Sequence, residues 1–169
     1  MDAALNPFAP GAGTQPPELT GRTDNLEHAR VALERIRNGR LNRSSLLIGL
    51  RGVGKTVLLN RMKKMAETRG YYSVFIESPE ATPLAELLAP YLRQILLQID
   101  LIQGAKDKMR RALGALRAFA STFKLEIGDI GVGVVAASGA ADSGTLEKDL
   151  TDLLVCIGEA AQESSTAVA

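Results

Sequence analysis

A glycine-rich segment constrains the fold of this chain more than any other feature of its sequence. The segment runs from Gly49 to Thr56 and has the spacing Gly-x-x-x-x-Gly-Lys-Thr. A short apolar run, residues 44–48, precedes it, and apolar residues at helical spacing follow it as far as Gly70. A strand, a glycine-rich turn and a helix in this order predict a phosphate-binding loop, or P-loop.

The residue types in this loop match the chemistry of phosphate binding. The glycines allow a tight turn, in which the backbone amides of about residues 52–57 face phosphate oxygens at a helix N-terminus. Lys55 is expected to reach the β- and γ-phosphates, and the hydroxyl of Thr56 is expected to complete the ligand shell of Mg²⁺. The predicted ligand is therefore ATP with Mg²⁺, and the predicted binding residues are Gly49, Gly52, Val53, Gly54, Lys55, Thr56 and Val57.

Hydrolysis of a bound nucleotide needs a further acidic residue at the end of a neighbouring strand. Glu77, which follows the apolar residues 74–76, is the best candidate for this catalytic acid. Asp100 and Asp129 are weaker candidates, because neither follows a long predicted strand. The sequence therefore predicts nucleotide binding with an incomplete set of residues for hydrolysis.

The rest of the pattern predicts an α/β fold with helices and strands in alternation. Helices are expected from Asp24 to about Asn38, from the P-loop to Gly70, and over residues 83–104, 109–120 and 143–161. Strands are expected at residues 44–48 and 72–76, parallel to each other, and the glycines within residues 123–136 predict a short β-hairpin. The predicted fold class is a P-loop NTPase three-layer sandwich with a parallel sheet core, incomplete, with the hairpin as an insertion.

The N-terminal residues differ in character from the rest of the chain. Residues 1–22 are predicted to form an extended arm, and residues 23–169 a partial P-loop ATPase core. Residues 166–169 resemble the start of a further strand. The prolines that interrupt the arm are Pro7, Pro10, Pro16 and Pro17.

Composition argues against several classes of partner. Lys plus Arg number 20 and Asp plus Glu number 19, so the net charge of +1 creates no general attraction to nucleic acid or anionic lipid. No run of about 20 apolar residues occurs, and the first 25 residues lack the pattern of a secretory signal. Cys156 is the one cysteine, which excludes an internal disulfide. A cytoplasmic protein without a membrane span is expected.

The chain resembles the AAA+ superfamily of ATPases, and in particular its origin-recognition-like and STAND-like branch. The P-loop carries most of the resemblance, and residues 17–22, Pro-Glu-Leu-Thr-Gly-Arg, are similar to the Gly-Arg box ahead of the first helix of that family. The resemblance implies that Leu19, Gly21 and Arg22 line the base side of the nucleotide. It also implies that the chain acts, within a complete ATPase, as a switch driven by nucleotide binding.

In that family, the strand with the Walker B acid pair follows the helix equivalent to residues 143–161. The chain ends at Ala169, where that strand would begin, so an N-terminal fragment is expected. The expected partners are ATP and, through uncovered apolar surface, a second copy or a protein partner, whereas DNA would bind only through domains outside this chain. The alternatives are a non-enzymatic nucleotide-binding adaptor and, less favoured, a small-molecule kinase. The guanine-reading Asn-Lys-x-Asp motif of GTPases does not occur.

Overall fold

The computed structural model describes residues 21–40, 42–103, 107–130 and 134–169. The chain divides into two compact units, the first formed by residues 1–71 with Ala169 and the second by residues 72–168. Each unit is described by itself below. The predicted arm, residues 1–22, lies outside the described residues except for Gly21 and Arg22.

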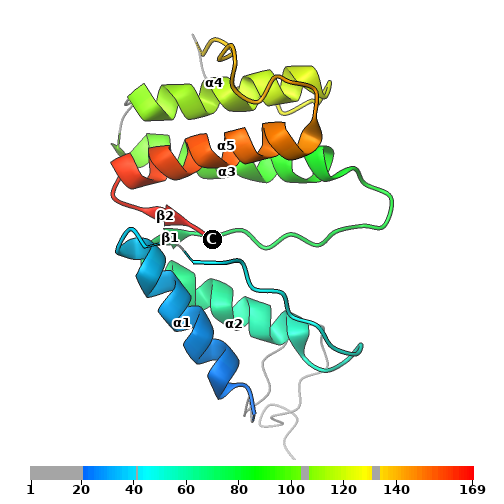
Figure 1. Ribbon diagram of the computed structural model, residues 1–169, viewed down its shortest axis with the longest axis vertical. Helices are drawn as coiled ribbons and strands as arrows, with labels where there is room; N and C mark the ends of the chain where they lie inside the picture. Colours follow the sequence, from blue (N-terminus) through cyan, green and yellow to red (C-terminus); the bar gives the residue numbers. More distant parts are fainter. Residues whose placement is uncertain (1–20, 41, 104–106, 131–133) are drawn as a thin grey trace, which may run out of the picture. The chain divides into compact units, whose positions relative to one another are not determined.

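Two helices that pack against each other form the first unit (Figure 1). Helix α1 spans Thr23–Arg37 and helix α2 spans Lys55–Glu67. Leu33 of α1 and Leu58 of α2 are buried. The hydroxyl of buried Tyr71 donates a hydrogen bond to the carbonyl oxygen of Leu33, which ties the end of the unit back to α1.

Three helices that lie side by side form the second unit: α3 (Leu84–Gln103), α4 (Asp107–Thr122) and α5 (Leu146–Glu163) (Figure 1). Alanines recur at the contacts between these helices and allow their axes to approach closely, while larger apolar side chains fill the space between them. The fully buried large side chains of this core include Ile95, Leu96, Ile99, Met109, Leu116, Phe119, Leu153 and Ile157.

The five predicted helices are therefore confirmed, with ends within a few residues of the expected positions. Helix α1 ends at the predicted place, because Asn38 is its C-cap and Gly39 adopts a left-handed φ of +69°. The N–H groups of both residues bond to carbonyls of the last turn of the helix.

The predicted parallel sheet is reduced to two short strands. Strands β1 (Tyr71–Tyr72) and β2 (Ala167–Val168) pair in a two-stranded sheet, and the boundary between the two units falls within β1. The strand predicted for residues 72–76 thus ends at Tyr72, whereas the strand expected near residues 166–169 is present. The structure does not confirm a three-layer sandwich.

The strand predicted for residues 44–48 is not formed. The side chains of Leu46 and Ile48 are 83% and 88% exposed, so no strand of the described residues covers this segment. A strand exists only through its ladder of hydrogen bonds to a partner, and an apolar run cannot specify that partner by itself. The prediction was therefore wrong for the secondary structure of this segment.

The hairpin predicted for residues 123–136 is also wrong, since residues 125–130 and 134–136 belong to no strand. Residues 134–137 instead lie along α4, where the N–H of Ala137 donates to the carbonyl of Gly114 at 3.0 Å. The guanidinium groups of Arg93 and Arg117 donate to the carbonyls of Asp129 and Val134. These hydrogen bonds to arginine side chains and to α4 thus satisfy backbone groups that a strand ladder would otherwise pair.

No helix of the described residues is long and apolar enough to cross a membrane.

Candidate nucleotide-binding site

The glycine-rich loop joins the extended residues 42–50 to the start of helix α2. Gly52 and Gly54 adopt left-handed φ values of +84° and +81°, which only glycine adopts without strain. Gly54 is the N-cap of α2, and its carbonyl accepts the N–H of Leu58 at 3.0 Å. The two glycines therefore turn the chain directly into the helix, as the sequence predicts.

This geometry favours the binding of an anion. The first N–H groups of a helix have no acceptor within the helix, and α2 has no side-chain cap at Gly54. The helix dipole adds a partial positive charge at the same end, and left-handed residues can gather neighbouring N–H groups into a concave anion site. The backbone of the loop thus provides donors and positive potential independently of side chains.

The side chain of Lys55 lies back over the loop. Its Nζ donates to the carbonyl oxygens of Gly49 and Leu50, each at 2.7 Å. An ammonium group has three N–H donors, so these two bonds leave one donor for a further acceptor. A Cβ on Gly49 would lie 3.2 Å from Cγ2 of Val53, so the first glycine leaves room for the Val53 side chain beside the start of the loop.

Thr56 and Val57 occupy the first turn of α2. The Thr56 residue is exposed, which leaves its hydroxyl accessible to a metal ion, and Val57 is half-buried. No group of three or more His, Cys, Asp or Glu side chains that could hold a metal occurs in the described part of the chain. A Mg²⁺ ion would therefore need oxygen ligands from phosphate and water besides Thr56.

Arg22 also reaches the P-loop. It is the N-cap of α1, follows Gly21, which has a left-handed φ of +78°, and its Nη2 donates to the carbonyl oxygen of Val53. The sequence does not reveal this contact, because Arg22 and Val53 are 31 residues apart. Leu19, the third predicted base-side residue, lies outside the described residues.

Glu77, the predicted catalytic acid, is an exposed residue of the second unit. Its role in hydrolysis stays a prediction.

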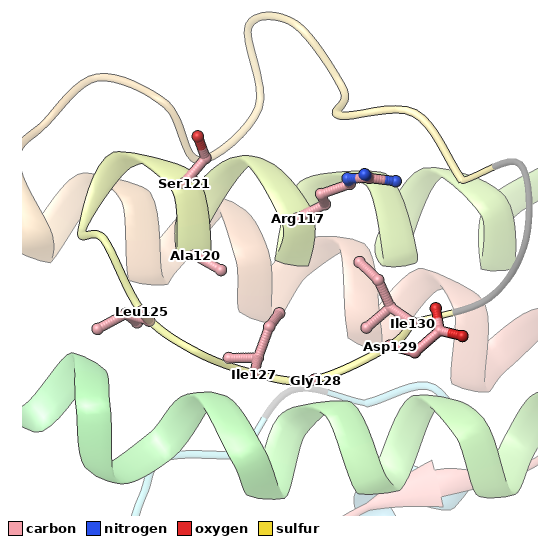
Figure 2. Close-up of a pocket in the computed structure, with 8 residues that line it drawn as sticks. All are labelled: Arg117, Ala120, Ser121, Leu125, Ile127, Gly128, Asp129 and Ile130. Carbon is pink, nitrogen blue, oxygen red and sulfur yellow. The ribbon is translucent and has the colours of Figure 1, made fainter.

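The second unit contains a pocket of about 360 Å³ between α4 and the segment after it. Figure 2 shows the segment of residues 125–130 passing beneath α4, with Ile127 and Ile130 rising toward the helix. Of the residues that the sequence predicts for the site, the pocket contains only Asp129, one of the weaker candidates for the catalytic acid. Its lining consists of Arg117, Ala120, Ser121, Leu125, Ile127, Gly128, Asp129 and Ile130.

A glycine-rich loop with two left-handed glycines, followed by Lys-Thr at the start of a helix, defines the class of P-loop proteins. A family model described as the AAA ATPase domain matches residues 18–168. The chain therefore belongs to the AAA ATPase domain family, which implies a P-loop NTPase fold and a nucleotide-binding ATPase function. Searches of the curated proteins and of the solved structures found no match.

Proposed function

We propose that this chain binds ATP with Mg²⁺ on the loop from Gly49 to Thr56 and acts as the nucleotide-dependent switch of an AAA+ ATPase. The observation that carries the proposal is the position of Lys55. This lysine begins helix α2 directly after the left-handed Gly54, and its ammonium group lies over the loop that would hold the phosphates.

The residues fit a triphosphate. The backbone N–H groups at the start of α2 would bind phosphate oxygens, and Lys55 would donate to the β- and γ-phosphates. The exposed hydroxyl of Thr56 would serve as a Mg²⁺ ligand. Mg²⁺ would neutralise part of the phosphate charge. Gly21 and Arg22 ahead of α1 support the origin-recognition-like or STAND-like branch within the family.

Hydrolysis is a separate part of the proposal. Glu77 is the residue proposed to hold the attacking water or the metal, because it is the acid that follows the apolar residues 74–76. If no residue of this chain supplies the acid, the chain binds ATP without hydrolysing it. The alternative is a non-enzymatic adaptor, in which ATP binding only raises the stability of the folded state by mass action.

Calorimetric titration of ATP with Mg²⁺ tests the binding, with the wild type, Lys55→Ala and Lys64→Ala compared. Lys64 is an exposed lysine of the same helix and controls for the loss of one positive charge. Lys55→Ala is expected to weaken binding about 10- to 100-fold, because hydrogen bonds to charged groups contribute about 1.5–3 kcal/mol. Lys64→Ala should bind like the wild type, and equal losses in both variants would argue against a specific role for Lys55.

Phosphate release, measured in the same samples, separates the two forms of the proposal. Turnover that Glu77→Gln abolishes, with ATP affinity unchanged, would assign Glu77 as the catalytic acid. Binding without turnover in the wild type would agree with the incomplete set of hydrolytic residues that the sequence predicts. A folded wild type that binds no ATP would contradict the proposed function itself.

A further inference from the structure

Arg22 makes two contacts that connect the start of α1 to the P-loop. Its backbone carbonyl accepts the N–H of Leu26 at 3.1 Å, which fixes Arg22 at the N-cap of the helix. Its side chain is half-buried and donates to the carbonyl oxygen of Val53. The guanidinium group is therefore held between a helix end and one carbonyl of the loop.

The bonded carbonyl has a particular position in the loop. The C=O of Val53 and the N–H of Gly54 belong to one planar peptide group, in which they point in opposite directions. A donor that holds the carbonyl on one side therefore directs the Gly54 N–H to the other side. Gly54 is the N-cap of α2, so this N–H belongs to the set of donors at the proposed phosphate site.

This peptide group needs to be held from outside. Both glycines that flank Val53 are left-handed, and glycine has more backbone freedom than any other residue. Free rotation of the Val53–Gly54 peptide would turn the N–H away from an anion and replace it with a carbonyl oxygen, which repels phosphate. A hydrogen bond from a charged donor is strong enough to favour one orientation.

We propose that Arg22 is a positioning residue for phosphate binding: it orients the Val53–Gly54 peptide so that the Gly54 N–H faces the triphosphate. This inference rests on the proposed function, since it assumes that the P-loop holds nucleotide phosphates. It gives Arg22 a role other than lining the base, which the resemblance implies, because its guanidinium is bonded to the loop carbonyl. Arg22 acts through Val53 and Gly54 and makes no contact with the base in this role.

The test compares ligands that share the triphosphate and differ in the base. ATP, GTP and inorganic tripolyphosphate, each with Mg²⁺, are titrated into the full chain for the wild type, Arg22→Ala and Arg22→Lys. Arg40→Ala is the matched control, because Arg40 is an exposed arginine of the same unit outside the P-loop and its loss removes the same charge. Melting temperatures of all variants without ligand are measured alongside.

Arg22→Ala is expected to weaken the binding of ATP and of tripolyphosphate by the same factor, about tenfold. The ratio of ATP to GTP affinity should stay unchanged. Arg22→Lys should recover part of the loss, since lysine keeps a charged donor without the planar fork of arginine. Arg40→Ala should bind all three ligands within about twofold of the wild type. In the NMR spectrum, the Gly54 amide should shift in Arg22→Ala.

Three outcomes would overturn the inference while leaving the proposed function intact. The first is a changed ratio of ATP to GTP affinity with unchanged tripolyphosphate binding, which would place Arg22 at the base. The second is an equal loss in Arg40→Ala, which would show that the loss follows from net charge alone. The third is a lower melting temperature with unchanged phosphate affinity in both Arg22 variants. A wild type that binds neither ATP nor tripolyphosphate would instead overturn the proposed function, and this inference with it.

Discussion

The carboxylate of Asp149 is fully buried and accepts hydrogen bonds from both the backbone N–H and the hydroxyl of Ser143, at 2.9 and 2.6 Å. The N–H of Gly144 donates to its second oxygen at 2.8 Å. These donors precede helix α5, so Asp149 fixes the turn by which the chain enters the helix. Burial raises the pKa of the Asp149 carboxyl, but the bonds from Ser143 and Gly144 outweigh burial and lower it below its ordinary value.

The first prediction concerns the pH dependence of stability. A lowered pKa in the folded state means that Asp149 contributes stability above the pKa of the unfolded chain, and that this contribution is lost as the pH falls through the folded pKa. Asp149→Asn should lower the free energy of unfolding by about 1–3 kcal/mol near neutral pH. The NH₂ group of asparagine is a donor and cannot accept the hydrogen bonds that Ser143 and Gly144 donate to the carboxylate. Urea unfolding of both proteins at neutral pH and below about pH 3 checks this. The difference between them should shrink in acid, and a difference that stays constant would mean that the charge of Asp149 plays no part.

The second prediction concerns the close contact at Gly114 in α4. A Cβ at this position would lie 2.8 Å from the carbonyl oxygen of Val135 and 3.2 Å from Ala137, so the backbone along the helix would have to move. Gly114→Ala should therefore destabilise the protein by about 1–3 kcal/mol in urea unfolding.

Gly158→Ala is the matched control for this substitution. Gly158 is a helical glycine of α5 whose added Cβ would have no atom within 4 Å. Alanine there should stabilise the protein by about 0.5–1 kcal/mol, through its higher helix propensity. If both variants raised stability, helix propensity rather than the contact with residues 135–137 would decide the result.

The third prediction concerns Mg²⁺. Thr56 is the one residue of the P-loop proposed as a direct ligand of the metal, so Mg²⁺ alone should bind weakly and should bind tightly only together with ATP. Thr56→Ala should weaken ATP binding in Mg²⁺ by about tenfold, equivalent to about 1.4 kcal/mol, and have little effect in EDTA. Thr56→Ser keeps the hydroxyl and should restore the affinity. An equal loss with and without Mg²⁺ would indicate that Thr56 contacts phosphate instead.

The fourth prediction concerns the exposed segment before the P-loop. The Ile48 side chain is 88% exposed, whereas the Leu58 side chain is completely buried. Ile48→Ala should change the free energy of unfolding by less than about 0.5 kcal/mol, while Leu58→Ala should cost about 2–5 kcal/mol. Thermal and urea unfolding of both variants checks this contrast. A cost above 2 kcal/mol for Ile48→Ala would show that the segment packs against other apolar residues in solution.

Local patterns in the sequence were sufficient to predict the positions of the helices and the backbone conformation of the loop. Asn38-Gly39 ends α1 because glycine adopts the left-handed conformation of a helix C-terminus at little cost. The spacing of Gly52, Gly54 and Lys55 predicts the loop conformation for the same reason, since each requirement concerns a residue and its immediate neighbours. The roles of these residues in binding nucleotide stay predictions.

Contacts between distant residues could not be predicted in this way. An apolar run such as residues 44–48 is compatible with a strand, but only a partner segment at hydrogen-bonding distance makes it one, and in this structure Leu46 and Ile48 are exposed. The glycines of residues 123–136 resemble those of a hairpin, yet the segment bonds to α4 and to arginine side chains.

The sequence by itself determined where the five helices lie, that Gly49–Thr56 forms a tight turn into a helix, and which chemical groups the loop offers. The tertiary structure decided that Arg22 bonds to Val53 of this loop, that Asp149 is buried, and that residues 134–137 lie on Gly114. The physical reason is that helix propensity and backbone conformation depend on neighbours along the chain, whereas hydrogen bonds and burial between distant residues depend on how the packed elements bring them together.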